Sequence, residues 1–347
     1  AFAPQASKSL DAFDDSLPVQ TIISGKLRRY HHLTTLQHIL WPSLMWKNTK
    51  DVFKVLAGYF QSLGRLIVWR PDVVFTKGGF VCLPIGMAAA TLRIPLVIHD
   101  SDAHPGLTNR LLSRWATTIA TGAPLEYYNY PQERSHYVGI PVSEEFKVLS
   151  PTEQKAAKKT QGVDPDKPLF VVTGGGLGAN RLNKVVIDVL PKLQHLGSVI
   201  LVAGAGNYDA LREQFPKNTK HFQLFAFVTN MPQLLGAADV AVTRAGATTI
   251  LELAALKKPT VLVPNAALTG GHQLKNAAVY GEAQAAIVVD EDAMVERPEI
   301  LVKAIKAYLD DPKTTASMAE RFGQFAKPAA AYDMAELILA AAKSSRQ

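Results

Sequence analysis

Three segments in the second half of the chain have residue types and spacing that suit a phosphorylated ligand. The first is TGGGLGAN, residues 173–180, with glycines at 174, 175, 176 and 178 between a predicted strand and a predicted helix. Glycine allows positive φ and close backbone approach, and a helix N-terminus offers free N–H groups to a diphosphate. An ordinary tight turn between strand and helix has the same composition, so this segment alone does not establish a phosphate-binding site.

The second segment is TRAGATTILELAALKKP, residues 243–259. Residues 246–249 open a helix directly after a strand, which makes a second anion-binding helix start in this half of the chain. Glu252 follows one turn into that helix, where a carboxylate can accept both hydroxyls of a ribose. The alternative is a glutamate that only stabilises the start of its own helix through the helix dipole.

The third segment, GGHQLKNA at residues 270–277, places two uncharged amides at the start of a helix. Gln273 and Asn276 are three positions apart and can share one helix face. An amide suits a sugar hydroxyl. His272 lies beside them with no other metal-ligating residue type close by in the sequence, so we expect no metal there.

The first half has two polar clusters, each after a predicted strand. Gly78 and Gly79 form a turn beside Lys77. The second cluster comprises His99, Asp100, Asp102, His104, Thr108 and Asn109. These residues could in principle hold a metal, but their spacing matches no fixed metal motif, and we favour polar contacts with an acceptor substrate.

The elements that position these segments alternate between apolar strands and helices in both halves of the chain. Such a pattern indicates parallel sheets with both faces covered. It restarts at LFVVTGGG, after a polar, lysine-rich stretch at 143–168. We therefore predict an α/β protein with two Rossmann-like domains, over 1–142 and 143–327, and a final helix in 328–347 that packs back on the first domain.

The composition fits two globular domains and narrows the choice of partners. The 347 residues are 48% hydrophobic, with a net charge of +7, which favours anionic lipid or phosphorylated substrates. Long Lys/Arg blocks and interleaved basic and aromatic residues are absent from the sequence, so we expect no nucleic-acid partner. Cys82, the only cysteine, excludes an internal disulfide, and we expect a buried thiol in a reducing compartment.

A basic loop and an apolar helix in the first half suit a membrane surface. Lys26, Arg28 and Arg29 precede a helical pattern over 36–70 that has a broad apolar face. Such a helix can dock on anionic lipid, or its apolar face can belong to the core. The sequence has no segment that resembles a signal peptide or a spanning helix.

Taken in order, the motifs resemble one group within glycosyltransferase family 28, the enzymes that transfer N-acetylglucosamine (GlcNAc) to lipid-linked N-acetylmuramoyl-pentapeptide. The matching set runs from about residue 20 to the end of the chain and comprises GGF, IPLVIHDSD, PGLTNRLL, VGIPV, GGGLGANRLN, TRAGATTILELAALKKPTVLVP and HQLKNA. Each piece is loose, but the ordered set is specific.

The resemblance implies a GT-B fold, in which two Rossmann-like domains face a cleft. It implies inverting transfer of GlcNAc from UDP-GlcNAc to the lipid-linked acceptor (lipid I to lipid II) in peptidoglycan synthesis, at the cytoplasmic face of the membrane, with no cofactor or essential bound metal. The implied donor contacts are Val228 for uracil, Glu252 for ribose, Gln273 for the GlcNAc hydroxyls, and Gly176, Ala247, Thr248, Thr249, Ile250 and Leu251 for the diphosphate. The implied acceptor side includes Gly78, Gly79, His99, Asp100, Thr108 and Asn109.

The chain departs from the family pattern at several donor-side positions. Asp102 stands where the family's HEQN motif has a sugar-contacting Asn, and Ser143 stands where an Arg follows the GNPV segment. Gly176 and Gly271 replace a Ser and an Asp. The loss of a cation and a hydroxyl near the diphosphate leaves less charge compensation for the donor.

The family's first glycine-rich loop, GGTGGH, has no counterpart in this sequence, which opens at Ala1 without an initiator Met. We expect that the sequence starts after that loop and that the first domain is incomplete. Because the loop carries the family's active-site His, we assign no catalytic base.

Two other functions stay open. One is a related family 28 glycolipid synthase with another acceptor, such as diacylglycerol, and the other is a non-catalytic protein that binds a nucleotide sugar. A UDP-sugar 2-epimerase would need an acid–base set that the sequence does not show. A dinucleotide oxidoreductase is disfavoured, because no GxGxxG opens a βαβ unit with an acidic residue about twenty positions on.

Overall fold

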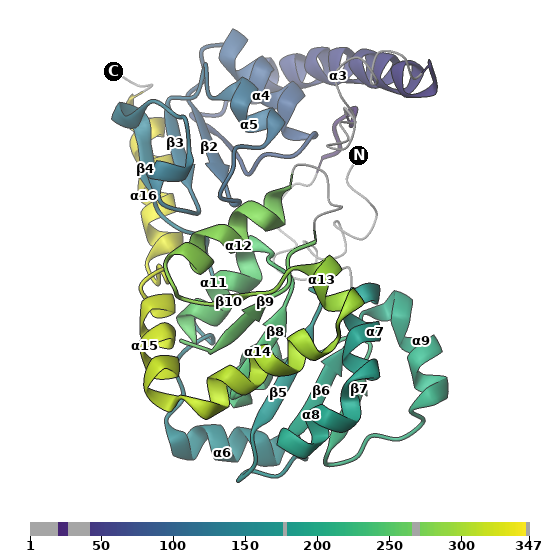
Figure 1. Ribbon diagram of the computed structural model, residues 1–347. Coiled ribbons are helices and arrows are strands. Elements are labelled where there is room, and N and C mark those ends of the chain that lie inside the picture. The colour runs from purple at the N-terminus through teal and green to yellow at the C-terminus, as the bar shows by residue number, and fades with distance from the viewer. Residues whose placement is uncertain (1–19, 27–41, 176–178, 266–270, 345–347) are drawn as a thin grey trace. The chain divides into compact units, whose positions relative to one another are not determined.

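The computed structural model of the protein describes residues 20–26, 42–175, 179–265 and 271–344. The chain divides into two compact units, one of residues 1–138 with 332–347 and one of residues 139–331 (Figure 1). Both boundaries lie four residues from the positions expected from the sequence, 142/143 and 327/328.

The first unit is built on a four-stranded parallel sheet in the order β1-β2-β3-β4. Its core gathers side chains from α3, α4, α5 and the strands around Leu96 and Leu112. In the C-terminal helix α16, Met334 packs with Ala120 of β3 and with Val138. The elements are α3 (Pro42–Trp69), β1 (Val74–Thr76), α4 (Cys82–Thr91), β2 (Leu96–Asp100), α5 (Leu107–Leu112), β3 (Thr118–Thr121), η1 (Leu125–Tyr127), η2 (Gln132–Arg134), β4 (Ser135–Tyr137) and α16 (Ala330–Ser344).

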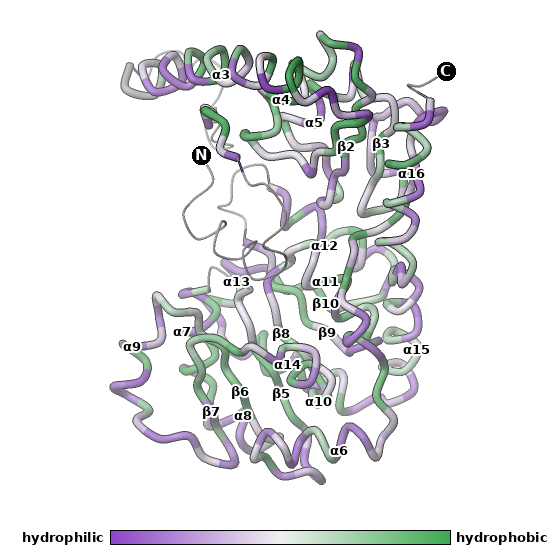
Figure 2. Tube along the Cα trace, turned by 180° about the vertical axis from the view of Figure 1, so that it is seen from behind, coloured by the Kyte–Doolittle hydropathy of each residue, from purple (hydrophilic) through white to green (hydrophobic). Residues whose placement is uncertain are grey.

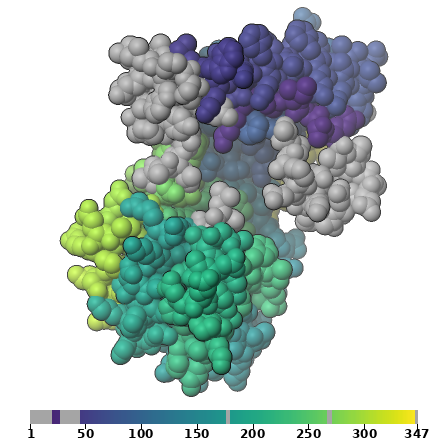
Figure 3. Space-filling model, turned by 90° about the vertical axis from the view of Figure 1, so that its right-hand side faces the viewer, coloured from purple at the N-terminus to yellow at the C-terminus, as the bar shows by residue number. Residues whose placement is uncertain are grey.

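The helix α3 begins at Pro42, where the fixed φ of proline suits a first turn. Its residues alternate between hydrophobic and hydrophilic from turn to turn (Figure 2), and the helix lies at the molecular surface (Figure 3). Only part of its apolar surface packs inward, with Val55 and Leu66 in the core of the first unit. The remaining apolar residues are exposed, so the core interpretation holds for one face only, and membrane docking of the other face stays a prediction.

The second unit is built on a six-stranded parallel sheet in the order β10-β9-β8-β5-β6-β7. Its strands are β5 (Leu169–Thr173), β6 (Ser198–Val202), β7 (Phe222–Phe225), β8 (Val240–Thr243), β9 (Thr260–Leu262) and β10 (Ile287–Val288). Its helices are α6 (Pro151–Thr160), α7 (Asn180–Asp188), α8 (Leu190–Leu196), α9 (Ala205–Gln214), α10 (Met231–Ala237), α11 (Ala247–Ala255), α12 (His272–Glu282), α13 (Glu291–Glu296), α14 (Glu299–Asp310) and α15 (Pro312–Gly323).

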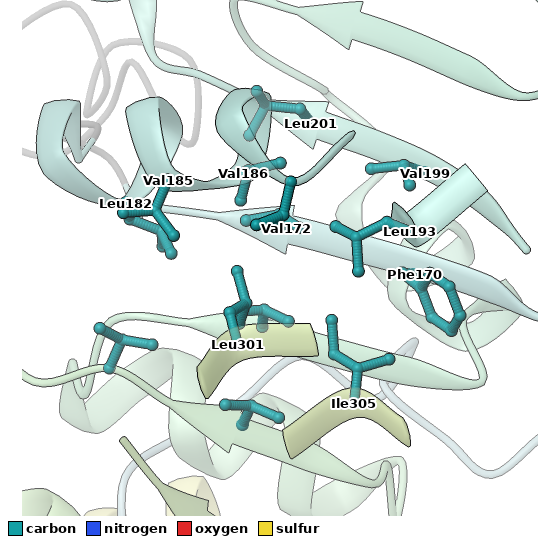
Figure 4. Packing of buried hydrophobic residues seen from close by; sticks show 14 of the residues in the cluster. Phe170, Val172, Leu182, Val185, Val186, Leu193, Val199, Leu201, Leu301 and Ile305 are labelled. Atoms are coloured by element: carbon teal, nitrogen blue, oxygen red, sulfur yellow. The ribbon is translucent and has the colours of Figure 1, made fainter. Parts of the chain in front are cut away.

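The core of the second unit forms because its central strands are apolar on both faces. Every residue of β5, β6 and β8 is buried, as a parallel sheet covered by helices requires. Figure 4 shows Phe170 and Val172 of β5 packed among side chains from neighbouring elements, with Val186 and Leu193 from the helices that follow β5 and Leu301 from α14. This rigid layer holds the loops at the carboxyl ends of its strands.

The strand order reverses between β5 and β8. From β5 the chain builds β6 and β7 on one side, and then it crosses to build β8, β9 and β10 on the other. Open parallel sheets bind ligands at the carboxyl ends of the strands at such a reversal. Thr173 and Thr243, the last residues of β5 and β8, are register partners, so the loops that follow them leave the sheet side by side.

The helices that follow the six strands differ in how they begin. After the edge strands β7 and β10, helices α10 and α13 are capped by the side chains of Asn230 and Asp290. After the four inner strands, α7, α9, α11 and α12 begin without a side-chain cap. Since first-turn N–H groups have no partner within a helix, the inner helix starts keep donors for a ligand.

Candidate functional site

The start of α11, at the strand reversal, has the geometry that the predicted diphosphate site requires. Gly246 precedes the helix in an extended conformation (φ −77°, ψ 130°), and the first helical bond at this end runs from the Ile250 N–H to the Gly246 carbonyl, at 3.0 Å. The N–H groups of residues 247–249 therefore have no helical acceptor. They point along the positive end of the helix dipole, where a diphosphate is stabilised.

Only some of the predicted diphosphate contacts on this helix are accessible to a ligand. Ile250 and Leu251 are 0% and 2% exposed, so their side chains belong to the interior of the unit. Ala247 and Thr249 are half-buried and Thr248 is exposed, and all three lie in the first turn. The groups that can meet a phosphate are thus the backbone N–H groups of these three residues and the two threonine hydroxyls.

The glycine loop after β5 lies beside this helix start. Gly175 has φ +72°, a conformation that favours glycine, and its N–H donates to the Thr173 hydroxyl at 3.3 Å. Gly176, which the resemblance places at the diphosphate, is outside the described residues. Helix α7 then begins without a side-chain cap, so a second helix start faces the same edge of the sheet.

Glu252 is a half-buried carboxylate one turn into α11. It makes no hydrogen bond or ion pair with any residue that the structure describes, and burial raises its pKa. A carboxylate held in this way is costly unless a donor satisfies it. A pair of ligand hydroxyls would supply that donor, as the ribose interpretation requires.

The two side-chain amides of the third segment, both on α12, make different contacts. The Gln273 side-chain oxygen accepts from the Asn265 backbone N–H at 2.8 Å, while its amide nitrogen has no acceptor among the described residues. Asn276 is 3% exposed and donates to the Ala245 carbonyl at 3.0 Å. The expectation that both amides share a ligand-facing side is therefore wrong for Asn276, which instead ties α12 to the loop before α11.

A buried charge network that the sequence did not reveal lies beneath this edge. Arg244, in the loop before α11, forms an ion pair with Glu291 of α13 and donates to the Val263 carbonyl at 3.1 Å. Both side chains of the pair are nearly inaccessible, at 7% and 3%. Arg181 of α7 pairs with the other Glu291 oxygen at 3.1 Å and with Asp292 at 2.6 Å. The Glu291 carboxylate thus links α13 to α7 and to the loop after β8, and Arg244 extends the network to the loop after β9.

In the first unit, the polar side chains after β2 mostly form hydrogen bonds within their own cluster. Asp100 accepts a short hydrogen bond from Tyr130, one of 2.8 Å from the Asn109 side chain and one of 3.4 Å from the Gly106 N–H. Burial raises the pKa of Asp100, and these hydrogen bonds oppose the rise. Asn109 also donates to the His99 carbonyl at 2.9 Å, and His99 is 0% exposed. These predicted acceptor-side residues thus build the end of β2.

The remaining acceptor-side residues lie around this network. Gly78 and Gly79 both have positive φ, +77° and +80°, and a Cβ on Gly78 would lie 2.9 Å from the Asn109 side-chain nitrogen. Thr108 is buried. The Asp100–Asn109 cluster therefore packs against the turn formed by Gly78 and Gly79 and fixes the backbone of that turn. This backbone is the part of the edge that a ligand can still reach.

Two family models match this architecture along the chain. The glycosyltransferase family 28 N-terminal domain matches residues 17–121, and the family's C-terminal domain matches residues 169–337. A curated relative from Clostridium kluyveri, 33% identical over 87% of this chain and 80% of its own length, agrees with both. The chain belongs to glycosyltransferase family 28.

Two relatives within family 28 have the same name. The C. kluyveri relative and one from Geobacillus thermodenitrificans, 35% identical over 80% of this chain and 73% of its own length, are both named UDP-N-acetylglucosamine–N-acetylmuramyl-(pentapeptide) pyrophosphoryl-undecaprenol N-acetylglucosamine transferase. Among solved structures, MurG of Acinetobacter baumannii is 26% identical, with a TM-score of 0.66 over 84% of this chain and 79% of that one. The α/β fold of two Rossmann-like domains is that of GT-B glycosyltransferases, as predicted.

A UDP-GlcNAc 2-epimerase from Neisseria meningitidis also matches, with a TM-score of 0.60 over 84% of this chain and 82% of that one. At 12% identity this likeness shows a shared fold only.

Three positions where the chain departs from the family 28 pattern lie in the described part of the molecule. Ser143 is exposed, and its hydroxyl accepts from the Glu145 N–H at 3.3 Å. Gly271 has φ +57° and directly precedes α12, a conformation that an Asp adopts less readily. Asp102 is half-buried, and its backbone carbonyl accepts from the Tyr128 hydroxyl at 2.7 Å.

Val228 and Cys82 complete the predicted residues. Val228 is half-buried in the loop after β7, at the same carboxyl edge as α7 and α11. Cys82 is half-buried at the start of α4, so the expected full burial is wrong, and desolvation raises its pKa. In the part of the chain that the structure describes, no three His, Cys, Asp or Glu side chains gather as a metal site requires.

Proposed function

We propose that this protein is an inverting hexosyltransferase that moves GlcNAc from UDP-GlcNAc to a lipid-linked MurNAc-pentapeptide. The observation that carries the proposal is the strand reversal of the second unit, where an uncapped helix start and a half-buried carboxylate one turn later lie on the same helix. The family membership and the names of relatives at 33–35% identity support the donor and acceptor.

The leaving group is the part of the reaction that this site handles. The acceptor hydroxyl attacks C1 of GlcNAc, a C1–O bond forms, and the bond from C1 to the β-phosphate oxygen breaks, so UDP departs with the electron pair. The N–H groups at the start of α11 stabilise the added charge without having to reorganise. Glu252 holds the ribose and Gln273 contacts the GlcNAc hydroxyls, which fixes C1 for in-line attack. We assign no residue to accept the proton of the attacking hydroxyl.

Donor binding and transfer can be measured separately on the protein expressed from its natural gene. Calorimetry should show that UDP-GlcNAc binds, and transfer of radiolabelled GlcNAc to a lipid I analogue should follow. Transfer to diacylglycerol in place of lipid I would favour the glycolipid-synthase alternative. Binding without transfer to either acceptor would favour a non-catalytic protein, and a failure to bind UDP-GlcNAc would contradict the donor site itself.

We further propose that α3 brings the protein to the cytoplasmic face of an anionic membrane. Trp46, Phe53 and Phe60 are 63%, 65% and 66% exposed and lie seven residues apart, which places them along one side of the helix. Lys50 lies 5.0 Å from the centroid of the Trp46 ring. Aromatic side chains beside cations are typical of helices that lie in a membrane interface. No helix among the described residues is long and apolar enough to cross a membrane.

Sedimentation with vesicles tests this docking. The protein should bind vesicles containing phosphatidylglycerol more tightly than pure phosphatidylcholine vesicles, and added salt should weaken the binding. Phe53→Glu combined with Phe60→Glu should abolish sedimentation, whereas Leu339→Glu, at a 60% exposed position on α16, should not. Equal loss with the control variant would contradict a specific role for α3.

A further inference from the structure

A cavity of about 460 Å³ in the second unit lies along the C-terminal half of α11, and of the predicted donor-side residues Ser143 and Leu251 line it. Three segments line it: residues 142–148, the C-terminal half of α11, and the end of α15 with the turn that follows. Its apolar wall comprises Val142, Phe146, Val148, Leu251, Ala254, Ala255, Ala326 and Pro328. The volume falls in the range of about 300–1,000 Å³ that small-molecule sites occupy.

The charges that line the cavity are mostly positive. Lys147, Lys257 and Lys327 line it with a single carboxylate, Glu144. Lys257 donates to both carboxylate oxygens of Glu320, at 2.6 and 2.8 Å, which holds its ammonium in place and leaves a third N–H for another acceptor. An apolar hollow with an excess of lysines is complementary to a ligand with a hydrocarbon body and an anionic head.

The stems of two of these lysines are seated by glycines. A Cβ on Gly323 would lie 2.8 Å from Cγ of Lys257, and a Cβ on Gly139 would lie 2.6 Å from both Cβ and Cγ of Lys327. Any larger residue at these glycines would have to displace the lysine stems. Both lysines are half-buried residues whose stems begin close to these glycines, although the Lys257 side chain is 41% exposed.

The backbone of Lys257 is unusual as well. Its φ of +49° is in the left-handed region, which glycine or asparagine normally occupies just after a helix. A lysine pays a free-energy cost in this conformation. The position at the end of α11 places its side chain between the cavity and Glu320.

We propose that this cavity is a binding site for an amphipathic anion, a molecule with an alkyl body and a carboxylate or phosphate head. The head pairs with Lys327 and with the third N–H of Lys257, and the alkyl body covers Phe146 and Ala255. The site is separate from the helix start that binds the donor, because it lies along the C-terminal half of α11. It requires neither UDP-GlcNAc nor an acceptor.

Calorimetry with decanoate and decyl phosphate, each below its micelle-forming concentration, tests the site. At least one of the two should bind with one-to-one stoichiometry, and their relative affinities tell a fatty-acid ligand from a phosphorylated one. Decyltrimethylammonium and inorganic phosphate should bind much more weakly, because each lacks one half of the required chemistry. Saturable binding of the cation equal to that of the anions, or no binding of either anion, would overturn the proposal.

Variants locate the binding to this cavity. Ala255→Phe fills the hollow and should weaken anion binding about tenfold or more, while Lys327→Gln should weaken it about fivefold. The matched controls are Ala316→Phe, at an exposed position of α15, and Lys192→Gln on α8, whose lysine pairs with Glu299 of α14. The UDP-GlcNAc affinity and the melting temperature report whether each variant folds. Wild-type anion affinity in a folded Ala255→Phe protein would exclude this cavity as the site.

Discussion

The carboxyl edges of the two sheets use their polar residues in opposite ways. After β2 in the first unit, the carboxylate of Asp100 is satisfied by Tyr130, Asn109 and the Gly106 N–H. At the strand reversal of the second unit, Glu252 has no partner among the described residues, and the adjacent helix start has no side-chain cap. The Asp100 carboxylate is thus satisfied within its own unit, although the buried side-chain oxygen of Asn109 has no partner among the described residues, whereas the Glu252 carboxylate is proposed to be satisfied by a ligand.

The contrast between Asp100 and Glu252 indicates how structural polar residues can be distinguished from ligand-binding ones. A buried polar group that is fully hydrogen-bonded stabilises its unit, so its loss appears in the free energy of unfolding. A half-buried charge without a partner costs stability when the site is empty, so its removal appears in ligand affinity instead. Variants and pH should therefore affect the free energy of unfolding at one kind of residue and ligand affinity at the other.

The largest effect is expected at Arg244. Arg244→Met leaves the nearly inaccessible Glu291 with only the half-exposed Arg181 as partner. Loss of one member of a buried ion pair typically costs about 3–5 kcal/mol, so denaturant unfolding should show a fall of this size in the second unit. The double variant Arg244→Met with Glu291→Leu should recover much of the loss, because no buried charge is left uncompensated. A single variant as stable as wild type would contradict the network.

The next effect is expected at Asp100, on the satisfied edge. Asp100→Ala leaves the Tyr130 hydroxyl without its acceptor and the Asn109 amide with only the His99 carbonyl, which should lower the free energy of unfolding by about 2–4 kcal/mol. The UDP-GlcNAc affinity, measured under conditions where the variant is folded, should not change. A variant with normal stability and impaired donor binding would reverse the comparison between the two edges.

A third effect is expected at Glu252, on the open edge. Glu252→Ala removes two charge-assisted hydrogen bonds to the ribose and should weaken UDP-GlcNAc binding about 100-fold, while the melting temperature stays the same or rises. Glu299→Ala, in which the lost glutamate lies at an exposed position paired with Lys192, serves as the control. A Glu252→Ala protein that binds UDP-GlcNAc normally but melts earlier would show that this glutamate only supports its helix.

Much of the fold could be predicted from local patterns in the sequence. The all-apolar stretches LFVVT, SVILV and VAVT predicted buried parallel strands, and glycines predicted the loops that follow. The segment that opens α11 could also be predicted, because a helix start and a carboxylate one turn later depend only on nearby residues. The separate contributions of Val228, Gln273 and the first-turn residues to donor binding stay predictions.

What the sequence could not show depends on contacts between distant residues. Tyr130 reaches Asp100 across 30 positions, and Glu291 reaches Arg244 across 47, so neither network has a local signature. Asn276 has the spacing to share a face with Gln273, but its burial against Ala245 follows from how α12 packs. An arginine in the otherwise apolar stretch VAVTRAGA was the one available signal, since a buried arginine needs a partner.

The smallest effect is a pH dependence of donor affinity. Burial raises the pKa of Glu252 above its ordinary value of 4.5, so as the pH falls this carboxyl gains a proton earlier than an exposed glutamate does. The protonated form accepts the ribose hydroxyls less well, and UDP-GlcNAc affinity should therefore decline by a few-fold as the pH falls through this raised pKa. For folding the sign is opposite, because the raised pKa means that the free protein is stabilised by the added proton. In Glu252→Gln the affinity should be lower throughout and flat over the same pH interval. A wild-type profile that is also flat would mean that the carboxylate does not contact the donor.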